Sequence, residues 1–200
     1  MRIIIWFAAL LPAVYALIRF SVEFHPQWMK DIGIFLEPLL HVVLTRKPTD
    51  PLKFLSDLSG NSALWLLAVT LLVTLLRSYI GINFLRYRRL LGLFAFFYAL
   101  IHAFLFIGID QQFNFMGVNH EVVSKPFIAF GMGAFVILLL MALTSSKKMY
   151  AKFKSWHKLV YIAVVLIALH YLMSHKTITL THIAVVGTLL SLLALRLLKR

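Results

Sequence analysis

Residues 90–109 read LLGLFAFFYALIHAFLFIGI, and this stretch decides the fold. It contains no Asp, Glu, Lys or Arg, and it is about as long as a helix must be to cross the ~30 Å hydrocarbon core of a bilayer. Inside hydrocarbon only helices and closed barrels satisfy every backbone amide and carbonyl. The apolar residues run continuously instead of alternating, which favours a transmembrane helix over a barrel strand.

Similar apolar runs recur along the whole chain, which is 62% hydrophobic and 14% charged. Soluble domains are roughly half apolar and about a quarter charged, so much of this surface is expected to face lipid. We predict an all-α bundle of six transmembrane helices in one domain, residues 1–200. The helices are expected at 3–18, with a kink at Pro12, and at 64–80, 90–109, 126–143, 157–173 and 178–198. Four prolines, Pro26, Pro38, Pro48 and Pro51, are expected to break the segment between residues 21 and 61.

Basic residues gather between the helices and account for a net charge of +13. They cluster at 86–89 and 147–154, whereas the segment from Asp110 to Lys125 carries acidic residues. Cationic loops favour the cytoplasmic side, so we place both termini in the cytoplasm. This distribution also argues against nucleic-acid binding. The chain has no cysteine, which removes disulfides, iron–sulfur clusters and thiolate metal sites.

His102 and His170 are the residues with the clearest chemistry, because an ionisable side chain inside a transmembrane helix is costly and usually functional. A single histidine there can simply hydrogen-bond a neighbouring helix. Two of them suggest a shared ligand. Their helices are expected to run in the same direction and to carry the imidazoles at similar depth. A haem held between them, with one histidine nitrogen on each face of the iron, is the predicted arrangement.

A second level is expected nearer the cytoplasm, because His157 lies 13 residues before His170 and Arg88 lies 14 before His102. His157 is a candidate ligand of a second haem, and Arg88 a weak ligand or a propionate partner. Their simpler interpretations are an interfacial histidine and a topology-setting cation. The remaining histidines are weaker candidates: His25, His41, His120, His175 and His182.

Two neighbouring features favour packing over chemistry. The phenylalanines at 94, 96, 97 and 130 more often indicate ordinary helix packing than a porphyrin contact. Gly131 and Gly133 form a G-x-G inside an apolar helix, which favours close helix approach over dinucleotide binding.

Several fragments resemble the MsrQ (YedZ) family, the haem-binding membrane subunits of bacterial methionine sulfoxide reductase systems with a ferric-reductase-like transmembrane architecture. They are Arg88-Arg89-Leu90-Leu91-Gly92-Leu93, Leu100-Ile101-His102, Lys125-Pro126-Phe127, Ala142-Leu143-Thr144-Ser145, Trp156-His157-Lys158-Leu159-Val160-Tyr161 and His170-Tyr171-Leu172. No single fragment is decisive, but their order and spacing are specific.

This resemblance implies b-type haem, one or two per chain, on residues matching His102, His157 and His170, with Arg88 as a further participant. It also implies FMN, for which no residue pattern locates a site. Electrons would pass from the quinone pool to MsrP, a periplasmic molybdopterin enzyme that reduces methionine sulfoxide, across the bacterial inner membrane. The chain itself would carry no catalytic residue. The related ferric reductases append nicotinamide-binding domains, for which no room follows Leu197, so a separate donor such as quinol or a flavoprotein is expected.

Two other classes of function fit the same residues. Buried histidines relay protons in pumps and transporters, and such a protein would bind no pigment. A passive membrane anchor or assembly subunit would need neither histidine.

Overall fold

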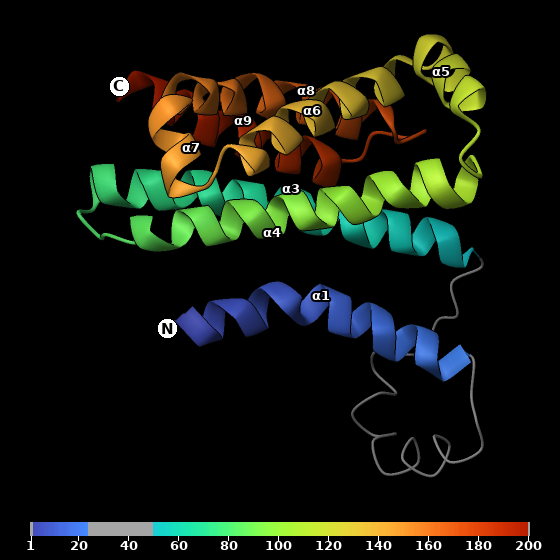
Figure 1. Ribbon diagram of the computed structural model, residues 1–200, viewed down its shortest axis with the longest axis horizontal. Helices are drawn as coiled ribbons and strands as arrows, with labels where there is room; N and C mark the ends of the chain where they lie inside the picture. The colour runs from blue at the N-terminus through green and yellow to red at the C-terminus, as the bar shows by residue number, and fades with distance from the viewer. Residues whose placement is uncertain (1, 24–49, 200) are drawn as a thin grey trace.

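The computed structural model describes residues 2–23 and 50–199, and every described regular element is helical. The longer helices are α1 (Arg2–Glu23), α3 (Pro51–Tyr79), α4 (Leu85–Phe104), α6 (Pro126–Leu143), α8 (Val160–Met173) and α9 (Leu180–Leu198). The π-helical turn η1 (Leu105–Asp110) extends α4, and the 3₁₀ turn η2 (Lys154–Leu159) leads into α8. Two shorter helices, α5 (Phe115–Ser124) and α7 (Lys147–Lys152), lie at opposite ends of the bundle (Figure 1).

Five helical segments within the described residues are long and apolar enough to cross a membrane. They are Pro51–Tyr79, Leu85–Asp110, Pro126–Leu143, Ser155–Met173 and Leu180–Leu198. Helix α1 contributes a shorter apolar stretch, Ile3–Leu17. The expectation of an all-helical membrane protein is confirmed, and five of the six expected spans meet the length and composition of a membrane helix.

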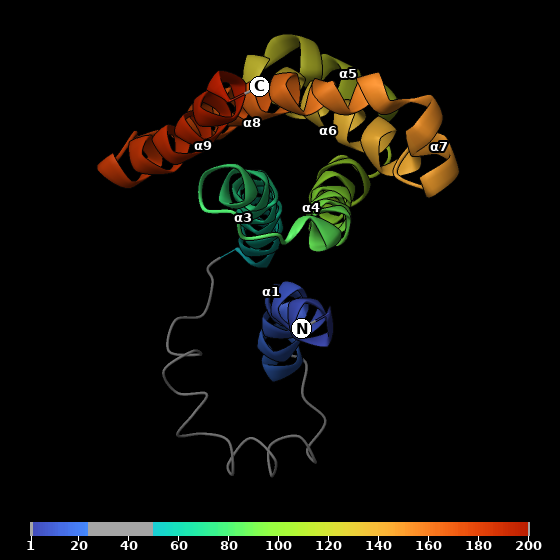
Figure 2. The ribbon, with the colours of Figure 1, turned by 90° about the vertical axis from the view of Figure 1, so that its left-hand side faces the viewer.

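The helices form layers (Figure 2). Helices α6, α8 and α9 make one layer, α3 and α4 pack against it, and α1 lies on the far side of α3 and α4. The start of α1 and the end of α9 lie at the same end as α7 and the α3–α4 turn (Figure 1). We call this the basic end, after Arg86, Arg88, Arg89, Lys148 and Lys152, and the opposite end the α5 end.

Helix α1 is attached to the bundle by the hydroxyl of Tyr98, a side chain only 2% exposed. Pro12 lies inside α1 and has no amide hydrogen to donate, which weakens the helical ladder at this point. The Tyr98 hydroxyl accepts from the Ala13 amide at 3.2 Å and donates to the Ala9 carbonyl at 2.7 Å. In a regular α-helix the Ala13 amide would donate directly to the Ala9 carbonyl. The Tyr98 hydroxyl is inserted between these two groups, next to Pro12.

Helix α3 begins at Pro51, whereas the sequence predicted a start near residue 64. Pro51 occupies the first turn, where its missing amide hydrogen costs nothing, and the Asp50 carboxylate accepts from the Lys53 amide at 3.0 Å. Ser59 and Ser62 then donate to backbone carbonyls of the preceding turn. The polar residues therefore extend α3 toward the α5 end, beyond its apolar part.

The segment between Asp110 and Lys125, expected to be a loop, contains helix α5. Asn114 caps it by accepting from the Gly117 amide at 3.1 Å.

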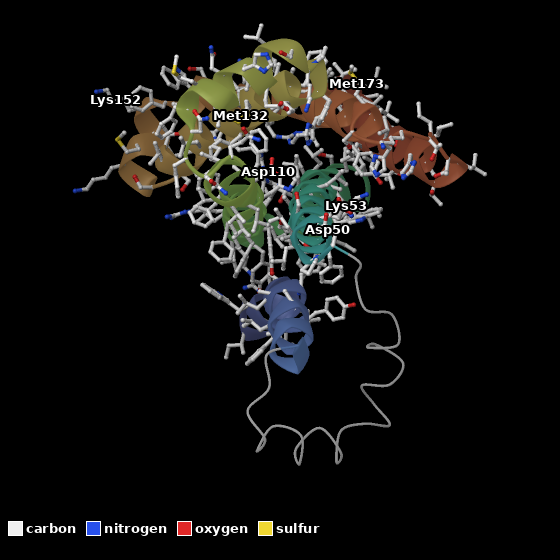
Figure 3. All side chains as sticks on the ribbon, turned by 90° about the vertical axis from the view of Figure 1, so that its right-hand side faces the viewer. Asp50, Lys53, Asp110, Met132, Lys152 and Met173 are labelled. Carbon is white, nitrogen blue, oxygen red and sulfur yellow. The ribbon has the colours of Figure 1, made fainter. Side chains whose placement is uncertain are left out.

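Side chains crowd the interface between the layers along the bundle (Figure 3). A cluster of buried apolar residues fills the middle, with Leu71, Ala95, Val164 and Leu189 at its most buried points. Ala95 and Val164 precede the two key histidines by about two turns. The solid core therefore stops short of the α5 end.

Candidate functional site

His102 on α4 and His170 on α8 face each other near the α5 end of the bundle. Their ring centroids are 6.1 Å apart and the ring planes cross at 80°. Helices α4 and α8 run in the same direction (Figure 1), so residues from two distant parts of the sequence reach the same level. The predicted meeting of these two imidazoles is confirmed.

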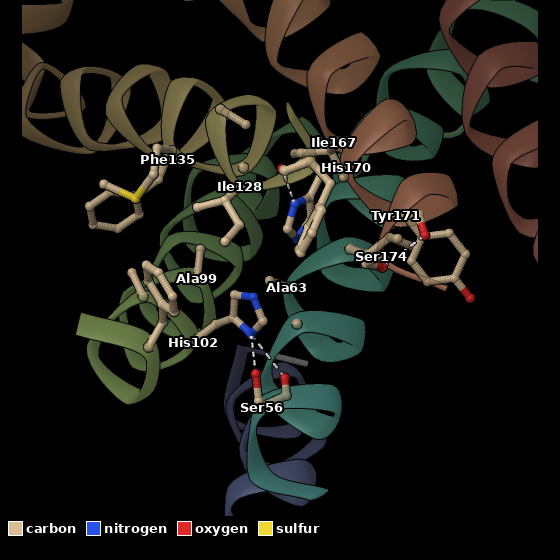
Figure 4. A pocket seen from close by; sticks show the side chains of 18 of the residues that line it. Ser56, Ala63, Ala99, His102, Ile128, Phe135, Ile167, His170, Tyr171 and Ser174 are labelled. Carbon is tan, nitrogen blue, oxygen red and sulfur yellow. Dashed lines mark hydrogen bonds between the residues drawn. The ribbon is translucent and has the colours of Figure 1, made fainter. Parts of the chain in front are cut away.

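Hydrogen bonds to backbone carbonyls fix the orientation of both rings. Nδ1 of His102 lies 2.9 Å from the Ser56 carbonyl oxygen, and Nδ1 of His170 lies 2.7 Å from the Phe127 carbonyl oxygen. A carbonyl only accepts, so each Nδ1 carries a hydrogen, and in the neutral imidazole this leaves Nε2 with a free lone pair. Metal-binding histidines are commonly oriented in this way. Figure 4 shows both remaining nitrogens directed into the space between the rings.

Glycines let the neighbouring helices approach the rings closely. A Cβ atom at Gly131 on α6 would lie 2.7 Å from Nδ1 of His170, and one at Gly60 on α3 would lie 3.2 Å from Nδ1 of His102. The expectation that Gly131 permits close approach is confirmed. Gly60 was not identified from the sequence, because a single glycine among polar residues resembles any other small residue.

A cavity of about 480 Å³ surrounds the two histidines. Its walls come from α3, α4, α6 and α8, and are mostly apolar; Ala63, Ala99, Ile128, Phe135 and Ile167 are examples (Figure 4). Its volume lies within the range of about 300–1,000 Å³ that is usual for small-molecule and cofactor sites. The polar part of the lining, which we call the rim, includes Asp57, Asp110, Glu121, Lys125 and His175, and the first, second and fourth of these are exposed.

These residues fit a metal with two axial imidazoles and a planar apolar ligand. Two metal–nitrogen bonds of about 2 Å, with the short distances from each nitrogen to its ring centre, span about 6 Å. The observed separation is 6.1 Å. Crossed ring planes would be compatible with such a site, because each imidazole would offer only its Nε2 lone pair, whatever the angle between the planes. Within residues 2–23 and 50–199, no group of three or more His, Cys, Asp or Glu could hold a bare metal ion.

His157 and Arg88, the second expected pair, lie at the basic end. His157 sits on η2 with Nε2 3.4 Å from the Thr144 hydroxyl, and its ring packs 4.7 Å from that of Tyr150. Arg88 lies in the first turn of α4. The ring contact of His157 is with a tyrosine and not with a second histidine.

The other histidines have different surroundings. His25 and His41 lie outside the described residues, and His120 is exposed on α5. His175 and His182 stack on each other with ring centroids 3.9 Å apart. Nδ1 of His182 accepts from the Thr179 amide at 3.2 Å, so this histidine helps to cap α9.

The aromatic residues of the cavity are not those considered from the sequence. The lining includes Phe106, Phe127 and Phe135, and none of the phenylalanines at 94, 96, 97 and 130. Phe94 instead packs edge-on against Trp6 of α1, with ring centroids 4.9 Å apart. This contact confirms helix packing as the interpretation of Phe94. The spacing in the sequence did not show which face of α4 meets α1.

Comparisons with known proteins agree with the fold. Residues 59–168, more than half of the chain, match the family described as ferric reductase like transmembrane component. The chain belongs to this family of multi-pass membrane proteins. His102 and His157 lie within the matched region, and His170 follows two residues after it.

The chain is also similar to proteins named protein-methionine-sulfoxide reductase heme-binding subunit MsrQ from Brucella ovis, Brucella canis and Brucella suis. Each is 45% identical over 132 residues, which cover 64% of this chain and 60% of the relative. The similarity thus spans less than two thirds of these relatives. No solved structure matches the chain significantly.

Proposed function

We propose that this chain binds b-type haem in the membrane between His102 and His170 and carries electrons across the bilayer. The observation that supports this most is the pair of carbonyl-oriented imidazoles 6.1 Å apart inside an apolar cavity. Haem supplies reversible one-electron transfer when it is bound. The residues of the chain hold the two nitrogens in place and surround the porphyrin with apolar side chains.

The proposed topology has six spans with both termini in the cytoplasm and the His102–His170 site near the opposite face. It is supported by the cationic side chains gathered at the basic end, where α1 begins and α9 ends. Helix α1 would be the sixth span. Its bond to the buried Tyr98, one turn before His102, puts it alongside membrane-spanning α4.

For its biological role, we propose the electron-transfer subunit of a protein-methionine-sulfoxide reductase system in a bacterial inner membrane. The basis is the similarity to the MsrQ relatives, whose printed name includes haem binding. In this proposal, electrons come from the quinone pool and pass to a periplasmic molybdopterin partner of the MsrP type. That partner, and not this chain, would reduce methionine sulfoxide. The expectation of FMN stays a prediction from the family resemblance.

A second haem at the basic end, involving His157 and Arg88, remains part of the proposal. It is supported by their spacing from His102 and His170 in the sequence and by their common position at the basic end. The environment of His157 is less typical of a ligand, because its Nε2 already contacts the Thr144 hydroxyl.

A reduced-minus-oxidised absorption spectrum of the purified protein, expressed with ample haem, tests the proposal. We expect the sharp bands of a six-coordinate b-type cytochrome. A flat difference spectrum would rule out haem binding and favour a histidine-based proton pathway. To separate an electron carrier from a passive anchor, partner-dependent sulfoxide reduction is compared between wild type and the double variant His102→Ala/His170→Ala. The carrier loses this activity, whereas an anchor keeps it.

A further inference from the structure

The rim of the cavity is mainly acidic. Within the described residues it is lined by three carboxylates, Asp57, Asp110 and Glu121, and by one lysine, Lys125, as its only lysine or arginine. Haem b carries two propionate groups, which three carboxylates would repel and a lysine would attract. An anionic ligand edge therefore has one favourable partner on this rim.

The backbone holds Lys125 firmly at this position, because the residue both ends α5 and begins α6. Its amide donates to the Glu121 carbonyl at 2.9 Å, and its carbonyl accepts from the Ile128 amide at 3.0 Å. Phe127, whose carbonyl orients His170, follows two residues later. The position of the lysine is thus linked through a short rigid segment to the orientation of the imidazole.

The side chain of Lys125 is paired with the Glu121 carboxylate one helical turn earlier. It remains half-exposed, which leaves its ammonium group able to take a second anionic partner. An ammonium group has three hydrogens to donate, so binding one carboxylate does not exhaust it. Glu121 therefore holds the lysine at the cavity mouth, with donors left for a further anion.

We propose that Lys125 binds a propionate of the haem held by His102 and His170, and that Glu121 positions the ammonium group at the cavity mouth. This inference rests on the proposed function. It assigns a direction to the haem within the cavity, with a propionate edge toward the junction of α5 and α6. It also gives the lysine of the Lys125-Pro126-Phe127 segment a role that its sequence position alone does not indicate.

The test uses full-length protein produced without haem and reconstituted either with haem b or with its dimethyl ester, whose propionates are blocked. The rate of haem loss to an excess of a haem scavenger is measured for wild type, Lys125→Gln and Lys125→Arg. Lys176→Gln is the matched control, because Lys176 is exposed in the α8–α9 loop and does not line the cavity.

With haem b, we expect Lys125→Gln to lose haem about tenfold faster, as for removal of a charge-assisted hydrogen bond. Lys125→Arg and Lys176→Gln should stay near the wild-type rate. With the dimethyl ester, Lys125→Gln should equal wild type. The inference is overturned if Lys125→Gln behaves like Lys176→Gln with haem b, or if it speeds loss of the ester to the same extent.

Glu121→Gln is a second test of the inference, and its result does not depend on whether Lys125→Gln folds. If Glu121 positions the ammonium group for the propionate, its neutralisation speeds loss of haem b and leaves loss of the ester unchanged. If the Lys125–Glu121 pair only supports the fold, the variant loses both ligands faster, and the inference fails. If the wild-type protein never forms the bis-imidazole spectrum, the proposed function itself is contradicted. If the spectrum is normal but the Lys125 and Glu121 variants lose haem at the wild-type rate, only this inference is contradicted.

Discussion

The two ends of the bundle carry comparable pairs of residues in very different surroundings. At the α5 end, His102 and His170 meet across 6.1 Å, with Nδ1 of each ring on a backbone carbonyl. At the basic end, His157 lies on a 3₁₀ turn in contact with Thr144 and Tyr150. Similar spacing in the sequence therefore leads to a facing pair of imidazoles at one end only.

The difference lies in what orients each imidazole. A backbone carbonyl fixes the tautomer as well as the ring, because it can only accept a hydrogen bond. The Thr144 hydroxyl donates its one hydrogen to the Leu140 carbonyl, so it can only accept from Nε2 of His157, and that nitrogen then has no free lone pair for a metal. Glycines also bring the helix backbones close to the rings at the α5 end. We infer that the α5 end is preorganised for a metal and that the basic end is less so.

The largest effect is expected from His170→Ala, which removes one of the two axial nitrogens. This variant should lose the haem of the α5 end, because one imidazole alone leaves the other side of the metal without a protein ligand. His157→Ala should keep that haem and its six-coordinate spectrum. Absorption spectra and the haem-to-protein ratio measure both effects, with exposed His120→Ala as the control. Equal losses in the His170 and His157 variants would contradict the difference between the two ends.

The next effect is a graded one from glycine to alanine substitutions. Gly131→Ala places a Cβ 2.7 Å from Nδ1 of His170, so the ring must move and haem binding should fall severely. Gly60→Ala makes a 3.2 Å contact with His102 and should be milder. Gly187→Ala meets nothing within 4 Å, and should be neutral or stabilise α9 by up to about 1 kcal/mol. Haem content and thermal unfolding check this order, and a Gly187 effect as large as that of Gly131 would contradict it.

The sequence predicted the part of the site that depends on helix direction and rise. Counting residues along two parallel helices was enough to bring His102 and His170 to one level. It did not identify the Ser56 and Phe127 carbonyls, because every residue has a carbonyl and only the packing of α3 and α6 selects these two. It also missed the first turns of α3, since polar residues and Pro51 resemble a loop until the Asp50 cap is known.

A smaller effect is expected from Thr144→Val at the basic end. The substitution removes a buried hydroxyl that donates to the Leu140 carbonyl at 2.7 Å and contacts His157 at 3.4 Å. A cost of about 1 kcal/mol in the free energy of unfolding is expected, together with a freer His157 ring. Denaturant unfolding measures the cost, and the spectrum of the α5-end haem should not change. A change in that spectrum would show that the two ends are coupled.

The smallest effect is expected from Ser56→Ala at the α5 end. It removes a hydroxyl 3.3 Å from Nδ1 of His102 but keeps the backbone carbonyl at 2.9 Å. The change in unfolding free energy should stay within about 0.5 kcal/mol, with an unaltered haem spectrum. Spectra and unfolding curves collected beside those of Thr144→Val give a direct comparison. A larger effect at Ser56 than at Thr144 would show that side chains, and not the backbone, orient the α5-end imidazoles.

The ligation of one iron by His102 and His170 is tested most directly by electron paramagnetic resonance of the oxidised protein. We predict a low-spin ferric signal of bis-imidazole type that is lost in His102→Ala and in His170→Ala and is kept in His157→Ala. A bis-imidazole signal that survives in both of the first two variants would contradict the proposed site.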